Sequence, residues 1–226
     1  MPPRWFTKTE TFKKAYPERF FNAGIAEGNM MCVAAGLAAS GKIPFASTFA
    51  MFAAGRSFDQ IRNSIGYPHL NVKIGATHAG ITVGEDGASH QCNEDIALMR
   101  TIPGMVIINP SDAVEAKCAV EAAINHQGPV YMRFGRLAVS VINDKPDYKF
   151  EMGKGILMAD GNDVTIVATG IMVEQALIAR EMLLAEGISA AVINMHTIKP
   201  LDKELILACA RETGAIVTAE EHSIIG

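Results

Sequence analysis

The residues best suited to chemistry lie between positions 77 and 91, in the stretch THAGITVGEDGASHQ. This stretch contains two histidines, His78 and His90, two adjacent carboxylates and three glycines. It follows an apolar segment at 70–76, which predicts a β-strand. A sheet positions such a loop rigidly, and glycine lets the backbone approach a ligand closely. The pattern therefore predicts a ligand-binding or catalytic loop at the end of a strand in an α/β protein.

The composition of the 226-residue chain is that of a globular protein, with 49% hydrophobic and 19% charged residues. Its formal net charge is -4 and it has no block of lysine and arginine. Nucleic acid and anionic membrane surfaces are therefore not expected as partners, because both require a basic surface. No apolar run is long enough to span a bilayer. Small molecules and other proteins are the expected partners.

The four cysteines are scattered along the chain and form no CxxC pair: Cys32, Cys92, Cys118 and Cys209. The sequence does not start with a secretory apolar segment, so reduced thiols in a cytoplasmic protein are expected. Cys92, His78 and His90 could together ligate zinc, but the sequence offers no identifiable fourth ligand. No metal site is therefore expected among the residues of this chain.

Expected strands and helices alternate between residues 27 and 134. Apolar residues recur at helical spacing from Glu27 to Ser40, and Gly41 is typical of a helix end. Ser111 and Asp112 are typical N-cap residues for a helix that reaches about residue 125. The other expected elements are the strands 42–49, 70–76, 105–108 and 130–134 and the helices 52–65 and 94–100. This alternation predicts a doubly wound parallel sheet. Residues 1–17 lack such a pattern and are expected to form a surface segment.

A second, smaller α/β unit is expected after residue 137. Residues 138–155 are charged and aperiodic, which is typical of a linker between domains. The pattern that follows predicts strands at 164–168, 190–194 and 216–219 and helices at 173–185 and 201–210. We therefore predict a first domain at 1–137, a linker at 138–155 and an incomplete second α/β domain at 156–226.

Four stretches together resemble the transketolase family: GIAEGNM at 24–30, GLAASGKIPFASTF at 36–49, DQIRNS at 59–64 and THAGITVGEDGASHQ at 77–91. The resemblance begins near Phe20 and runs to the end of the chain. It is to the C-terminal half of the family, which holds the pyrimidine-binding domain and the start of the third domain. Split transketolases, whose two halves are separate chains, are similar in layout. The resemblance implies thiamine diphosphate-dependent transfer of a two-carbon ketol unit from a ketose phosphate to an aldose phosphate.

The resemblance also implies which residues contact the cofactor. Glu27 matches the glutamate that bonds to the aminopyrimidine ring and favours the imino form, which takes the thiazolium proton. Glu27 must be protonated to donate that bond; burial favours the protonated form, whereas a helix N-terminus favours the anion. Phe49 and Phe52 match positions around the pyrimidine, with Phe52 as the stacking residue. Each of these phenylalanines could instead be a core residue.

Four residues match family positions in the substrate channel: His78, Asp86, His90 and Arg136. By this resemblance the histidines bond to the sugar and His90 also moves protons, Asp86 recognises a hydroxyl, and Arg136 binds the phosphate. Two further residues stay open. Glu85 lies either in the loop or at a subunit contact, and Arg133 lies either in the site or in an ion pair of the sheet.

Three departures from the family pattern stand out. Gly28 replaces the usual His or Gln, which is expected to loosen the contacts behind Glu27. The first strand of the pyrimidine domain is missing before Thr7, and the third domain ends near its middle. The GDG motif with a later Asn, which holds the diphosphate and Mg²⁺ in the family, is also missing. We therefore expect Mg²⁺ on a partner N-terminal half that carries this motif, in an assembly of two copies of each chain.

Other functions share this fold and part of the pattern. A 1-deoxyxylulose-5-phosphate synthase and the beta subunit of a 2-oxo-acid dehydrogenase would both keep a glutamate like Glu27. The loop at 77–91 with EDIALMR at 94–100 favours transketolase. The alternative outside catalysis is a truncated transketolase-like subunit that only dimerises.

Overall fold

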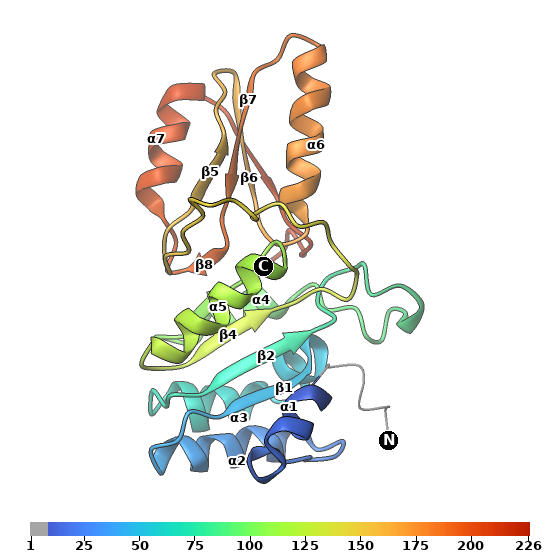
Figure 1. The fold of residues 1–226 in the computed structure, drawn as a ribbon, viewed down its shortest axis with the longest axis vertical. Helices are drawn as coiled ribbons and strands as arrows, with labels where there is room; N and C mark the ends of the chain where they lie inside the picture. The colour runs from blue at the N-terminus through green and yellow to red at the C-terminus, as the bar shows by residue number, and fades with distance from the viewer. Residues whose placement is uncertain (1–8) are drawn as a thin grey trace.

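The computed structural model describes residues 9–226, which form two β-sheets covered by helices (Figure 1). Residues 1–8 of the predicted surface segment lie outside the described residues. Both sheets are mainly parallel. The predicted α/β class is confirmed. Among residues 9–226, no helix is long and apolar enough to cross a bilayer.

The first sheet contains all four strands expected in the first domain. They are β1 (Phe45–Phe49), β2 (Lys73–Thr77), β3 (Val106–Ile108) and β4 (Val130–Arg133), and they lie parallel in the order β1-β2-β4-β3. The edge beside β3 is occupied by β8 (Thr197–Lys199), which runs antiparallel to it. The strand β8 was not predicted from the sequence. A short piece of the second half of the chain therefore closes the first sheet.

Helices cover both faces of this sheet. Those before the loop are α1 (Glu10–Ala15), the 3-10 turn η1 (Pro17–Arg19), α2 (Glu27–Ala39) and a helical region made of η2 (Met51–Arg56), α3 (Phe58–Gln60) and η3 (Ile61–Gly66). Those after it are α4 (Asp95–Arg100) and α5 (Ala113–Asn125). The helix expected at 52–65 is π-helical in η2 and η3, which widens its turns. The predicted cap of α5 is confirmed, because the Asp112 carboxylate accepts a hydrogen bond from the Glu115 N–H at 2.9 Å.

The second sheet has four strands where three were predicted. They are β5 (Ile156–Ala159), β6 (Val164–Ala168), β7 (Ala190–Asn194) and β9 (Ile216–Ala219), in the order β5-β7-β6-β9. The unpredicted strand β5 is an antiparallel edge. The helices α6 (Met172–Ala185) and α7 (Lys203–Thr213) lie on opposite sides of this sheet (Figure 1). Successive side chains of β7 point to opposite faces of the sheet, so Val192 packs in the cluster that contains α6 residues and Ile193 in the cluster that contains α7 residues.

The predicted linker at 138–155 is packed against both domains. The Asp112 carboxylate accepts hydrogen bonds from the backbone N–H groups of Ile142 and Asn143, at 2.8 and 2.7 Å. Burial alone would raise the pKa of Asp112, but the hydrogen bonds from Glu115, Asn143 and Ile142 together lower it below its ordinary value. The Tyr148 hydroxyl donates to the buried Glu115 at 2.6 Å. The segment therefore connects the domains as a fixed strap, while the domain boundaries themselves stay a prediction.

The core of the first domain lies between the sheet and the helices α2, η3 and α4. Its members are buried apolar side chains contributed by each of these elements, among them Met31, Ile61, Ile74, Met99 and Tyr131. The face of β3 and β4 toward α5 forms a second cluster around Ile108 and Met132. These two clusters hold the carboxyl ends of the strands in place, and the loop at 77–91 starts from one of those ends.

Lys73, the first residue of β2, is fully buried at the edge of the sheet remote from that loop. Its ammonium group donates to the carbonyl oxygens of His126 and Gly128, at 2.9 and 2.7 Å. Burial lowers the pKa of Lys73 to about 8 from an ordinary 10.5. The folded protein therefore binds this proton more weakly than the unfolded chain does.

The buried Lys73 predicts a rise in stability at alkaline pH. Between about pH 8 and 10.5 the unfolded chain holds more protons at this site, so the free energy of unfolding increases with pH, by at most about 3 kcal/mol. Below pH 8 the full cost of the buried charge is present. Urea unfolding at pH 8, 9 and 10 measures this slope, and a Lys73→Met variant is the control that lacks it. Equal pH slopes in the two proteins would contradict the prediction.

Candidate cofactor and substrate site

The candidate site lies at the carboxyl ends of β1, β2 and β4. Phe49 ends β1 beside Thr77, and Ala76 of β2 pairs with Arg133 at the end of β4. These strands are parallel, so the residues that follow them meet at one edge of the sheet. Figure 1 shows β2 and β4 ending on the side from which the loop after β2 projects. The predicted loop therefore begins at the sheet edge where α/β proteins bind ligands.

Four of the predicted residues form an aromatic cluster at this edge. The rings of Phe49 and His78 are stacked, with centroids 3.9 Å apart. Phe49 also lies nearly parallel to Phe52, at 5.8 Å. His90 presents its edge to both phenylalanines, at 5.9 and 5.3 Å. Residues from β1, η2 and both ends of the loop are thus brought together in one cluster of rings.

The loop folds back on itself so that His90 reaches this cluster. Gly80 and Cys92 form a pair of backbone hydrogen bonds across its base, of 2.8 and 3.3 Å. Inside the loop, the Gln91 amide donates to the Ile81 carbonyl at 3.0 Å. The Ser89 hydroxyl lies 2.9 Å from Nδ1 of His90. The loop is therefore a closed structure with its own hydrogen bonds.

His78 has a constrained backbone and a perturbed side chain. Its φ of 59° is in the left-handed region, and Nδ1 lies 3.1 Å from the Thr77 hydroxyl. Burial lowers the pKa of His78, Asp86 raises it, and Arg136 and His90 lower it further. The net shift is downward, so the neutral imidazole is favoured. His78 is thus suited to form hydrogen bonds as an uncharged group.

Arg136 is held by the two carboxylates of the loop. Its guanidinium bonds to Glu85 at 2.6 Å and lies 3.4 Å from Asp86. The 3-10 turn η4 (Gly84–Asp86) places both acids on the same side of the loop. Within this chain Glu85 therefore forms an exposed ion pair with Arg136, and its position at a subunit contact stays a prediction. A bound phosphate would have to compete with Glu85 for this guanidinium.

Glu27 is buried at the first turn of α2 and is paired with an arginine that the sequence analysis missed. Its side chain is 7% exposed, and Oε2 accepts a hydrogen bond from Nη1 of Arg56 at 2.9 Å. The same guanidinium lies 4.2 Å from the centroid of the Phe52 ring. The spacing of Phe52 and Arg56 by one helical turn could have indicated this contact. Arg56 thus links the two residues expected to hold a pyrimidine.

Gly28 leaves room for a neighbouring side chain. A Cβ at this position would lie 3.4 Å from Oε1 of Gln60. A larger side chain at position 28 would therefore meet the Gln60 amide of α3. The contacts behind Glu27, which were expected to be loose, are supplied in part by α3.

Arg133 belongs to a buried ion pair in the sheet. Its Nε donates to Asp95 at 2.9 Å, and both side chains are almost fully buried. The Tyr131 hydroxyl donates to the same carboxylate oxygen at 2.9 Å. Burial lowers the pKa of Arg133, but the charge and hydrogen bond of Asp95, with smaller contributions from Tyr131 and Glu221, together raise it above its ordinary value. The structure therefore selects the ion-pair alternative for Arg133.

The side chains at this edge fit an aromatic ligand with polar substituents. The cluster supplies aromatic rings, Glu27 a carboxyl group, and the loop two imidazoles. Among residues 9–226 there is no group of three or more His, Cys, Asp or Glu that could hold a metal ion. The Cys92 thiol is buried, and burial raises its pKa to about 12, which disfavours the thiolate needed for ligation.

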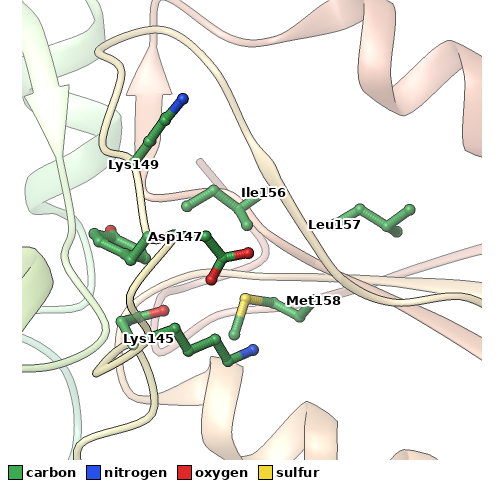
Figure 2. Close-up of a pocket in the computed structure, with 8 residues that line it drawn as sticks. Lys145, Asp147, Lys149, Ile156, Leu157 and Met158 are labelled. Atoms are coloured by element: carbon green, nitrogen blue, oxygen red, sulfur yellow. The ribbon is translucent and has the colours of Figure 1, made fainter.

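A pocket of about 280 Å³ lies elsewhere, between the strap at 138–155 and β5. Lysines and an aspartate line it together with apolar residues of β5: Asn143, Lys145, Asp147, Tyr148, Lys149, Ile156, Leu157 and Met158. Figure 2 shows the amino group of Lys149 pointing away from Asp147. None of the predicted site residues lines this pocket.

The same two domains are found in a known family of enzymes. Residues 6–141 match the transketolase pyrimidine-binding domain, and residues 153–226 match the transketolase C-terminal domain. The chain is 54% identical to a protein of Methanocaldococcus jannaschii described as a transketolase C-terminal section; the alignment covers 97% of this chain and 69% of that protein. It is 46% identical to a 6-deoxy-6-sulfo-D-fructose transketolase subunit of a Clostridium species, over 97% of this chain and 68% of the relative.

A solved structure shows the same arrangement. It is described as a split-gene transketolase, an inactive beta4 tetramer, and superposes with a TM-score of 0.89 at 57% identity. The match covers 97% of this chain and 71% of that one. The chain therefore belongs to the transketolase family, of which it carries the pyrimidine-binding domain and sequence of the C-terminal domain.

Proposed function

We propose that this chain is one subunit of a thiamine diphosphate-dependent transketolase. It would transfer a two-carbon ketol unit from a ketose phosphate to an aldose phosphate when a partner chain completes the cofactor site. The observation that supports this most directly is the stack of Phe49, His78 and Phe52 next to the buried Glu27. Family membership supports a transferase subunit of this kind.

Three residues would hold the pyrimidine end of the cofactor. Phe52 would stack on the ring, Phe49 would line it, and Glu27 would bond to a ring nitrogen. The bound cofactor would supply a carbanion that attacks the ketose carbonyl. In the structure Oε2 of Glu27 accepts a hydrogen bond from Arg56, so the ring would have to share this side chain with Arg56 or displace it.

Four residues would hold the sugar phosphate at the mouth of the site. His78 and His90 lie on the aromatic cluster, where they would bond to the carbonyl and hydroxyl groups. His90 would also move protons. Asp86 would bind a hydroxyl, and Arg136 the phosphate, once the ion pair with Glu85 opens.

A partner N-terminal half would supply the diphosphate and Mg²⁺ site through its GDG and Asn residues. The proposal is supported by relatives described as a C-terminal section, a subunit and a split-gene transketolase. Self-association is also proposed, because large apolar side chains are exposed on α2 and on the segments beside it: Phe21, Ile25, Val33, Ile43 and Phe45. We place the assembly in the cytoplasm, where the four free thiols would remain reduced.

Calorimetry and an activity assay together test this function. The chain alone is expected to bind thiamine diphosphate and Mg²⁺ weakly, whereas a mixture with an N-terminal half bearing GDG and Asn should bind them at least about 100-fold more tightly. The mixture should also transfer ketol units from xylulose 5-phosphate to ribose 5-phosphate. Tight binding by the chain alone would contradict the shared site. Dimerisation without cofactor binding or transfer would favour a non-catalytic subunit instead.

A further inference from the structure

The chain returns to the first domain after β9, beside the base of the candidate loop. Figure 1 places the C-terminal end near α4, between the two sheets. The Ser223 N–H donates to the Asn93 carbonyl at 2.8 Å, just after the loop ends. The carbonyl of Glu221 accepts a hydrogen bond from Nη2 of Arg133, also at 2.8 Å. Residues 221–223 thus bridge the second domain to the strand ends that carry the site.

The side chain of Glu221 reaches the other arm of the loop. It is 6% exposed, and its carboxylate accepts a hydrogen bond from the backbone N–H of Thr82. The carboxylate also lies against Gly80, so closely that a Cβ there would be 2.1 Å from its Cδ. Gly80 has a φ of 85°, which a side chain would also disfavour. The glycine therefore leaves the space that Glu221 occupies.

Both arms of the loop are held at one place. Gly80 and Cys92 pair across the base, Glu221 binds the first arm, and Ser223 binds the residue after the second. Nη2 of Arg133 donates to two carbonyl oxygens at this place, that of Cys92 at 3.4 Å and that of Glu221 at 2.8 Å. The positive charge of Arg133 and the negative charge of Glu221 attract each other and help to offset the burial of both groups.

We propose that Glu221 is a positioning residue that fixes the base of the loop at 80–92 and so the places of Asp86 and His90. It would contact no substrate itself. A charged acceptor is suited to this role, because a hydrogen bond from a backbone N–H to a carboxylate is stronger than one to a neutral group. The consequence for sugar binding rests on the proposed function, whereas the effect on the loop does not.

Hydrogen exchange in the chain alone tests the effect on the loop. Glu221→Ala is expected to speed the exchange of the Thr82 amide and of the other amides at 80–92 by about tenfold. The matched control is Glu220→Ala, which removes an exposed neighbouring carboxylate and should leave these rates unchanged. If Glu221→Ala does not fold, Glu221→Gln keeps the size of the side chain and should give about threefold faster exchange. Exchange rates equal to those of the unmodified chain in each folded variant would overturn the proposal.

Kinetics of the assembled enzyme test the effect on the site. Glu221→Ala should raise KM for the ketose phosphate about tenfold and also lower kcat, because a loosened loop holds both Asp86, which would bind a hydroxyl, and His90, which would also move protons, less precisely. A purely structural role would lower the amount of active enzyme and leave KM unchanged, and that result would overturn the positioning role. If the unmodified assembly transfers no ketol units, the proposed function fails, and the exchange experiment still decides whether Glu221 fixes the loop.

Discussion

Glu27→Gln is expected to lower kcat of the assembled enzyme by about 10²–10⁴-fold, with a small effect on folding. Glutamine keeps the shape of the side chain and can still form a hydrogen bond, but it cannot exchange a proton with the pyrimidine ring. The expected loss is the size of effect that a positioned acid or base contributes. Glu27 is almost fully buried, so no water or neighbouring acid can easily replace it.

The measurement is the rate of ketol transfer by the reconstituted pair at saturating cofactor and substrate. Glu121→Gln is the matched control, because Glu121 is an exposed residue of α5 far along the chain from the site, and this variant should keep its full rate. Circular dichroism and thermal melting should show that both variants fold. A Glu27→Gln enzyme that retained full kcat would remove Glu27 from the proposed role.

Arg56 affects how this result should be interpreted. Its guanidinium occupies the Glu27 carboxylate and lies over the Phe52 ring at the same time. Glu27 and Phe52 are the residues proposed to hold the pyrimidine, so on that proposal Arg56 and the cofactor would compete for the same two side chains. On the proposed function, cofactor binding would therefore exchange an internal ion pair for new contacts to Glu27 and Phe52.

The gathering of the site could be predicted from the sequence because it follows from strand order and direction. Phe49 ends β1 and His78 follows β2, and parallel neighbours place their carboxyl ends side by side. The resemblance at 77–91 then supplied Asp86 and His90 as residues of the same loop. Local patterns gave the helices well, including the Asp112 cap of α5.

The contacts missed by the sequence analysis join residues that are distant along the chain. Glu221 meets Thr82 across 139 positions, and Tyr148 meets Glu115 across 33. No periodicity or spacing encodes such pairs, because they depend on how two domains pack. The segment 138–155 was predicted as a linker because charged and polar side chains are typical of an exposed segment. Its buried partners, Asp112 and Glu115, lie far from it along the chain and could not be identified from the sequence. The strand β8 was missed because three residues are too few to show the alternation of apolar and polar side chains that indicates a strand.

Arg133→Met is expected to lower the free energy of unfolding by about 3–5 kcal/mol, the largest stability effect that the structure predicts for one side chain. Methionine fills part of the same space with an unbranched apolar side chain, but it leaves the Asp95 carboxylate buried without its cation. It also removes the hydrogen bonds to the carbonyls of Cys92 and Glu221. Tyr131 remains hydrogen-bonded to Asp95, but its neutral hydroxyl group cannot replace the positive charge of Arg133.

Urea unfolding of the chain at neutral pH measures this loss, and a double-mutant cycle assigns it to the pair. Asp95→Leu alone should also be strongly destabilising, because it leaves Arg133 buried and unpaired. The double variant Asp95→Leu/Arg133→Met should lose less than the sum of the two, with a coupling of about 2 kcal/mol or more. Arg62→Met is the control, since Arg62 is exposed and bonds only to the adjacent Asn63 among the described contacts; it should change stability by less than about 0.5 kcal/mol. Additive losses at 95 and 133 would show that the two charges are not coupled and would contradict the prediction.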